Sequence, residues 1–185
     1  MSSFATRYMI ETLISSKTRI KLLLKFFLNS STTAYLRSLE QEFGESTNAI
    51  RLELNRLEQA GMLTSQLQGN KKIFQANVQH PLFGEVHNII MKHIGLDRII
   101  ETVIDGLGKV NKIYLAGKFS QGLNSEIIDL ILVGDIDKIY LIRLIEKAES
   151  LVKRKIRYLI YTDKEYAKVK FSAGELKPLL IWSKD

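Results

Sequence analysis

A polar-faced helix followed closely by a short hairpin is the feature that most constrains this chain. In residues 46–60, STNAIRLELNRLEQA, apolar residues recur at helical spacing behind Ser46, whose hydroxyl is a suitable N-cap. The opposite face is polar and carries Thr47, Asn48, Arg51 and Asn55. Side chains of these types read base edges and hold phosphates, so we interpret the segment as a candidate recognition helix. The alternative is an ordinary solvated helix face.

The segment after this helix predicts a β-hairpin. Residues 64–77 form two short extended arms around Gly69-Asn70, a dipeptide typical of tight turns between strands. Lys71 and Lys72 follow the turn directly, where their charges can reach phosphates beside the helix. The helix and the hairpin therefore support the same interpretation.

Two further helices are predicted before the polar-faced one, over residues 17–28 and 33–43. In the first, Leu22 and Phe26 lie off the main apolar stripe, which predicts a second apolar contact, such as another subunit. Helix, turn, helix and hairpin in this order are typical of a winged helix-turn-helix.

The segments SKTRIKLLLKFFLN, YLRSLEQEFG, AIRLELNRLEQAGML and GNKKIFQAN resemble the winged-helix domains of prokaryotic regulators related to the arsenic-repressor type. The resemblance covers residues 15–77, and NRLEQAGML leading into the Gly-Asn-Lys hairpin is its most specific part. It implies that the four polar residues of the helix, Thr47, Asn48, Arg51 and Asn55, enter the major groove of double-stranded DNA. By the same resemblance, Lys71 and Lys72 contact the flanking backbone.

Composition is consistent with a polyanionic partner and excludes some other classes. The chain has 27 basic and 20 acidic residues, a net charge of +7, which both halves share. It has no cysteine, so disulfide scaffolds and thiolate metal sites are excluded. The most apolar early run, residues 22–28, is too short to span a membrane, and the first residues do not resemble a secretory leader. We therefore expect a cytoplasmic protein that does not interact with membranes.

Beyond two helices predicted within residues 80–108, strands and helices alternate. Strands are expected over residues 113–116, 127–133, 156–161 and 179–182, with helices after Asp137 and over residues 163–171. The nearly unbroken apolar run at 127–133 is typical of a central strand covered on both faces.

Within this region, YLAGKFSQGLNSEIIDLILVGDID and IRYLIYTDKEYAKV are similar to the minimal nucleotidyltransferase domains. In active members, two aspartates two residues apart on a strand hold Mg²⁺ with a third carboxylate from a neighbouring strand. Here Asp129 fills the second position, but Ile127 fills the first and Arg157 the third, and Lys118 replaces the serine after Gly117. We therefore expect an inactive domain with no catalytic residue, no metal and no cofactor.

The remaining polar residues of this degenerate cleft are Gly117, Lys118, Asp129 and Arg157. We hypothesise that Lys118 or Arg157 pairs with Asp129 in place of the lost metal, because an unpaired aspartate in an apolar strand would be costly to bury. The same two cations are candidates for holding an unidentified anionic ligand.

The predicted organisation is a two-domain α+β protein with an α/β second part. It comprises a winged helix over residues 1–79, a helical connector over 80–108 and a nucleotidyltransferase-like mixed sheet with flanking helices over 109–185. The expected function is that of a DNA-binding transcriptional regulator, acting as a homodimer because one recognition helix reads few base pairs. One alternative is an active Mg²⁺-dependent nucleotidyltransferase targeted by its winged helix. Another is a winged helix that contacts only protein.

Overall fold

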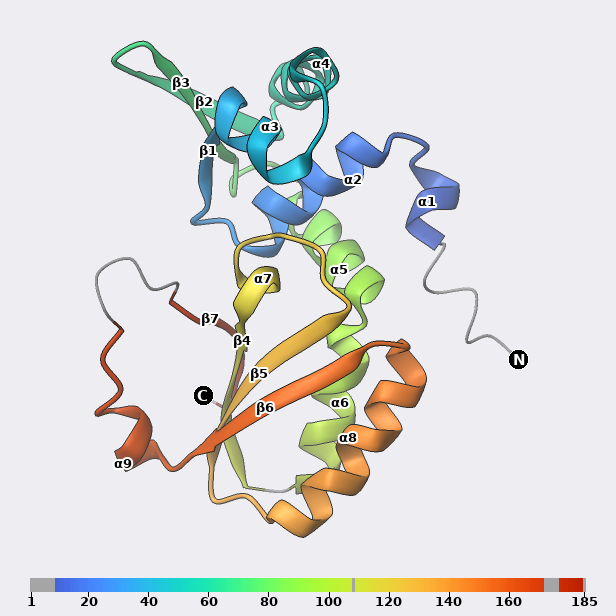
Figure 1. The fold of residues 1–185 in the computed structure, drawn as a ribbon, viewed down its shortest axis with the longest axis vertical. Helices are drawn as coiled ribbons and strands as arrows, with labels where there is room; N and C mark the ends of the chain where they lie inside the picture. Colours follow the sequence, from blue (N-terminus) through green and yellow to red (C-terminus); the bar gives the residue numbers. More distant parts are fainter. Residues whose placement is uncertain (1–8, 108, 172–176, 185) are drawn as a thin grey trace.

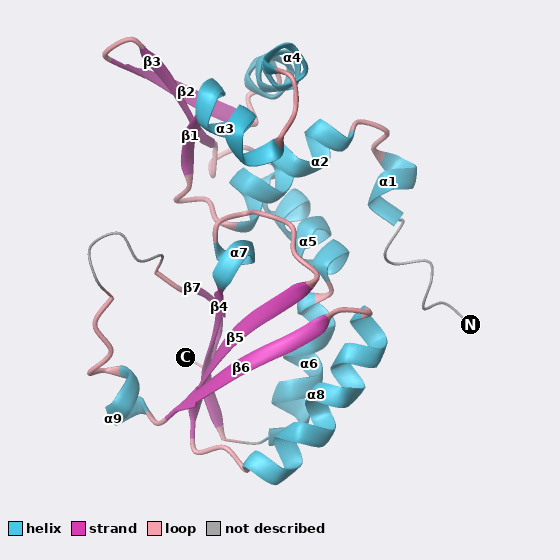
Figure 2. Ribbon diagram, in the orientation of Figure 1, coloured by secondary structure: helices cyan, strands magenta, loops and turns pink. Residues whose placement is uncertain are grey.

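The computed structural model describes residues 9–107, 109–171 and 177–184 (Figure 1). The first eight residues of the expected N-terminal domain lie outside the described residues. Within the described part, the chain is a mixed α/β protein with two small sheets, compatible with the α+β class (Figure 2). None of its described helices is both long enough and apolar enough to cross a membrane.

The described chain begins with three helical segments, α1 (Met9–Leu13), α2 (Lys17–Leu23) and the π-helix η1 (Leu24–Leu28). Ser16 caps α2 by accepting a hydrogen bond from the backbone amide of Arg19. The single helix expected over residues 17–28 is therefore divided, because its last turn widens to π-helical geometry. All five residues of η1 are buried, among them Lys25, whose burial the sequence pattern did not indicate.

The helix expected over residues 33–43 is wrong at its start. Residues of β1 (Thr33–Tyr35) precede α3 (Leu36–Phe43), and they pair antiparallel with β3 (Lys71–Ala76). Pairing with a strand distant in sequence decides the conformation of these three residues, and local periodicity cannot report such a contact. Gly44, with φ of 63°, ends α3 as expected.

The next helix and the hairpin form where the sequence predicts them. Ser46 caps α4 (Thr47–Gln59) by accepting a hydrogen bond from the Ala49 amide. The strand β2 (Leu63–Gln68) pairs antiparallel with β3, and Gly69 supplies the turn with φ of 62°. The apolar residues that α4 buries are Ile50, Leu54 and Leu57.

Two helices then lead from the first sheet to the second. The left-handed residue Gly95, with φ of 88°, separates α5 (Phe83–Ile94) from α6 (Leu96–Leu107). Contacts of α5 are mainly with η1, whereas α6 packs on α8 (Lys138–Val152) and on β4 (Val110–Ala116). Each helix therefore contributes to the core on its own side.

The second sheet has the strand order β6-β5-β4-β7. Its central strand β5 (Ile127–Gly134) pairs in parallel with β6 (Lys155–Tyr161) and antiparallel with β4, which also pairs with β7 (Leu179–Ser183). The sheet is therefore mixed, as the sequence predicts. Figures 1 and 2 show α6 and α8 together on one face of it.

The helix expected over residues 163–171 is much shorter. Only α9 (Asp163–Tyr166) forms, and Thr162 caps it through reciprocal hydrogen bonds with Glu165. Tyr166 packs on Tyr114 of β4, with ring centroids 4.7 Å apart. Burial and this tyrosine neighbour raise the pKa of Tyr166 to about 12. Contact between the rings of Tyr166 and Tyr114 thus holds α9 against the second sheet.

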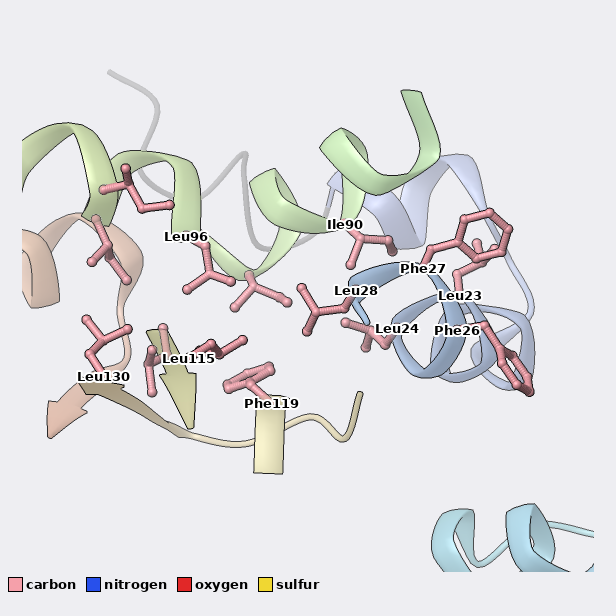
Figure 3. Packing of buried hydrophobic residues seen from close by; sticks show 14 of the residues in the cluster. Leu23, Leu24, Phe26, Phe27, Leu28, Ile90, Leu96, Leu115, Phe119 and Leu130 are labelled. Atoms are coloured by element: carbon pink, nitrogen blue, oxygen red, sulfur yellow. The ribbon is translucent and has the colours of Figure 1, made fainter. Parts of the chain in front are cut away.

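One apolar cluster runs through both parts of the molecule. Figure 3 shows Phe27 and Leu28 of η1 near Ile90 of α5 and Phe119 of α7 (Gly117–Ser120). Leu22 and Phe26 are completely buried within this same chain. The second apolar contact predicted for them is therefore confirmed, but it is made inside the chain and does not need another subunit.

A close backbone contact joins the loop after α7 to η1. Gly122 has φ of 71°, and a Cβ placed on it would lie 2.7 Å from the carbonyl oxygen of Lys25. Nearby, the side-chain amide of Asn29 donates a 3.1 Å hydrogen bond to the carbonyl of Ser120. No side chain larger than hydrogen fits at this contact without a shift of one backbone.

We predict that Gly122→Ala lowers the free energy of unfolding by about 2–4 kcal/mol, from left-handed strain and overpacking together. Gly84→Ala is the matched control, because a Cβ at this α5 position meets nothing within 4 Å. That control should leave stability unchanged or raise it slightly. Urea denaturation of the three proteins measures the difference. Equal stability of the two variants would contradict the close contact.

Candidate nucleic-acid interface and C-terminal cleft

An open cleft of about 510 Å³ lies between α3, α4 and the hairpin formed by β2 and β3. These elements lie together at one end of the molecule (Figure 1). Two aromatic residues, Tyr35 and Phe74, are among those that line the cleft. The polar side chains in the lining are Arg37, Arg51, Asn55, Asn70, Lys71 and Lys72. Four of these six are cations, so the cleft suits an anionic partner.

The helix α4 directs its polar face towards this cleft because its apolar face is buried. Arg51 and Asn55, one turn apart, are both exposed and both line the cleft. Thr47 and Asn48 lie one turn earlier on the same face, but they do not line it. Four of the six predicted DNA-binding residues therefore line the cleft together: Arg51, Asn55, Lys71 and Lys72.

The rear side of α4 is fixed by a buried carboxylate. Glu53 is only 5 % exposed, and its oxygens accept bonds from Arg19 at 2.8 Å and from Arg56 at 3.2 Å. Burial alone would raise the pKa of Glu53, but the hydrogen bond from Arg19 and the nearby charges outweigh it and lower that pKa. The acidic side chain thus anchors α4 to α2 and leaves the cleft face positive.

The two hairpin lysines differ in their surroundings. Lys71 Nζ lies 4.5 Å from the centroid of the Tyr35 ring. Lys72 Nζ donates a 2.7 Å hydrogen bond to the carboxylate of Glu58, which also accepts from the Ser65 hydroxyl. These bonds, that from Lys72 first, lower the pKa of Glu58. Part of the Lys72 charge therefore serves to hold the hairpin on α4.

Arg37 is a cleft residue that sequence reasoning missed. It lies in the first turn of α3, just after the N-cap residue Tyr35, whose amide donates to Ser38 Oγ. Arg37 is exposed, and neither it nor Arg51 makes an ion pair with any residue that the structure describes. A cation at the second position after the cap, in the helix that precedes the recognition helix, was the available signal.

In the second sheet, Asp129 pairs with Arg157. The parallel register of β5 and β6 sets the two residues opposite each other. Arg157 Nε donates a 2.6 Å hydrogen bond to Asp129 Oδ1, and this bond raises the pKa of the guanidinium. The predicted ion pair is therefore confirmed for Arg157.

The other two residues of the expected cleft, Gly117 and Lys118, lie in different places. Gly117, with φ of 62°, lies directly against the Asp129 carboxylate, so that a Cβ there would overlap Oδ2. Lys118 instead lines a separate cleft of about 200 Å³ together with Lys21 and Glu42 from the N-terminal half. Asp129, Arg157 and Gly117 thus lie together, whereas Lys118 lines a different cavity.

These residues do not fit a divalent cation. Asp129 already binds a guanidinium, and Ile127 stands on the same face two residues earlier. In the described ranges, no group of three or more histidines and carboxylates could hold a metal ion. Mg²⁺ requires several oxygen ligands, and a carboxylate bonded to arginine does not supply them.

No protein-family model matches the chain, and comparisons with curated proteins and with solved structures found no significant match. The functional argument therefore rests on the geometry of the two sites.

We predict that Glu58→Gln weakens the attachment of the hairpin to α4 by less than about 1 kcal/mol, since Lys72 is well exposed. Because the folded pKa of Glu58 is lowered from 4.5, its carboxylate adds stability above that value and loses it as pH falls through the folded pKa. The difference in urea midpoint from the wild type should exist at neutral pH and disappear once the pH has fallen below the folded pKa of Glu58.

Glu101→Gln is the control for this pH dependence, since Glu101 is exposed and has no ion pair within the described part of the chain. A difference for Glu58→Gln that persists unchanged in acid would contradict the assigned hydrogen bonds.

Proposed function

We propose that this chain is a DNA-binding transcriptional regulator whose N-terminal half acts as a winged helix. One observation carries the proposal: four cations from three elements converge on the cleft beside the polar face of α4. Two of them, Arg37 and Arg51, are exposed and make no ion pair with any described residue. An exposed cationic cleft beside a rigid helix favours a phosphate-rich partner over a neutral one.

In the proposed complex, α4 enters the major groove, which is wide enough for one helix. Arg51 and Asn55 are then the base-reading residues, because arginine donates in a bidentate way to guanine and asparagine pairs with adenine. Thr47 and Asn48 contact the backbone or the groove edge near the start of α4. Their place outside the cleft lining supports this lesser role.

Phosphate contacts are assigned to the residues around the helix. Lys71 of the hairpin and Arg37 in the first turn of α3 both line the cleft. Lys72 contributes less, since it is bonded to Glu58. Contacts of this kind fix the position of a protein on DNA without reading its sequence.

For the C-terminal half we propose a degenerate nucleotidyltransferase-like domain without catalytic activity. The bond between Arg157 and Asp129 supports this proposal, since it occupies the one carboxylate that matches the family pattern. The domain then serves dimerisation or ligand sensing in a cytoplasmic homodimer. Metal-dependent transfer from a labelled nucleotide triphosphate, abolished by Asp129→Asn, would overturn it.

We predict that Arg51→Ala weakens binding to the preferred DNA fragment by roughly 1–3 kcal/mol, because a base-reading guanidinium is lost. The fragment is first selected from random double-stranded DNA and then titrated at two salt concentrations. Arg56→Ala is the matched control: it removes the same charge from the same helix, on the face bonded to Glu53. Equal losses in the two variants would contradict a reading role for Arg51.

We also predict that Arg37→Ala and Lys71→Ala each reduce the slope of log affinity against log salt by about one, since each removes one phosphate contact. Both variants should weaken binding to all sequences alike. Lys72→Ala should change the slope less than Lys71→Ala. If a variant selects a different DNA sequence but keeps the wild-type slope, the residue reads bases and does not contact phosphates.

A further inference from the structure

The outer side of α8 exposes isoleucine side chains that no local requirement explains. Ile139 is 76 % exposed and Ile142 is 50 % exposed, although they lie on the same helix as a well-buried stripe. Asp137 caps the helix by accepting hydrogen bonds from the backbone amides of Ile139 and Tyr140. Any residue has such an amide, so the cap does not explain an isoleucine at position 139. The buried stripe consists of Leu141, Leu144, Ile145 and Ala148.

This side of α8 lies beside an edge of the second sheet. Glu149, two turns after Ile142, accepts a 2.8 Å hydrogen bond from the Ile156 amide and a 2.9 Å bond from Lys155 Nζ. Both donors belong to β6, which is the outermost strand in the order β6-β5-β4-β7. Within the described residues, no strand covers the outer edge of β6. The exposed isoleucines therefore lie on the helix that packs against this edge strand.

Charges on the same side of α8 have opposite signs at its two ends. Lys138 lies one turn before Ile142, and Glu146 lies one turn after it. Neither makes an ion pair with any residue that the structure describes. Lys138 does lie near Glu165 of α9, whose pKa is lowered mainly by hydrogen bonds with Thr162 and further by this lysine's charge. A second α8 packed antiparallel, with the two-fold axis at Ile142, brings each Lys138 beside the Glu146 of the other copy. Parallel packing would instead place like charges together.

We propose that a second copy of this chain binds this surface, with α8 packed antiparallel on α8 around Ile142. The pattern of lysine, isoleucine and glutamate is complementary to itself, as an isologous two-fold interface requires. Burial of Ile139 and Ile142 supplies the apolar centre, and the two lysine–glutamate pairs fix the orientation. This inference specifies the homodimer of the proposed function, and it does not depend on DNA binding.

Sedimentation equilibrium of the full chain tests the proposal. The wild type should be a concentration-dependent dimer. Lys138→Glu and Glu146→Lys should each raise the dimer dissociation constant about tenfold, since each reversal creates two repulsive contacts. The double reversal should restore it to within about threefold of the wild type, because the pairs re-form with exchanged signs.

Lys147→Glu is the matched control, since this exposed lysine lies on another side of α8 and should leave the dissociation constant unchanged. Ile142→Asp should give a folded monomer, with folding checked by circular dichroism. A monomeric wild type, a dimer unaffected by Ile142→Asp, or a double reversal no better than the single ones would each overturn the proposal.

The same variants separate this inference from the DNA-binding proposal. Monomeric Ile142→Asp that still binds a single DNA site through Arg51 supports both. A wild-type dimer that depends on Lys138 and Glu146 but does not bind DNA supports the surface and refutes the DNA-binding function. If the wild type is a monomer that binds lipid vesicles or another protein through Ile142, that partner and not a second copy occupies the surface.

Discussion

Burial of η1 on all sides is the constraint on which the arrangement of this molecule depends. Its side chains join the α2–α4 region to α5, and its backbone lies against Gly122 from the C-terminal half. Lys25 within it is 6 % exposed, and its ammonium lies 2.6 Å from the Glu42 carboxylate of α3. Breaking such a buried pair would leave an uncompensated charge. The position of α3, and with it one wall of the cationic cleft, is therefore tied to the same segment that contacts the second sheet.

The parts of the fold that the sequence predicts are those that local chemistry decides. Ser46 and Gly69 mark the cap of α4 and the turn of the hairpin, and both segments form as expected. The strand β1 and the π-helical turn were not predictable in this way, because pairing with β3 and packing against α5 decide them. Arg37 was missed for the same reason: it becomes a cleft residue only once α3 packs beside the hairpin.

The pairing of Asp129 shows how much the sequence could reveal about the second site. Strand periodicity places Asp129 and Ile127 on one face, and an apolar strand makes an unpaired carboxylate costly, so a cationic partner was predictable. Which cation it would be was not. Arg157 is the partner because parallel pairing of β5 and β6 brings it opposite Asp129, whereas Lys118 lies in α7 and lines a cleft with residues of the N-terminal half. The register of the strands, which composition cannot show, therefore decides the outcome.

The two proposed surfaces constrain each other through the rigid parts between them. The cleft beside α4 is tied to η1, η1 packs on α5, and α6 packs on α8, where the second copy is proposed to bind. A two-fold axis at Ile142 would thus fix the separation of two clefts without any flexible linker among these elements. Dimeric readers of DNA need their recognition helices about one turn of the double helix apart, roughly 34 Å, or a multiple of it. Since α4 and α8 lie towards opposite ends of the chain's long axis in Figure 1, the proposed dimer would favour the longer multiples, and a DNA-binding dimer of this kind would need widely spaced half-sites.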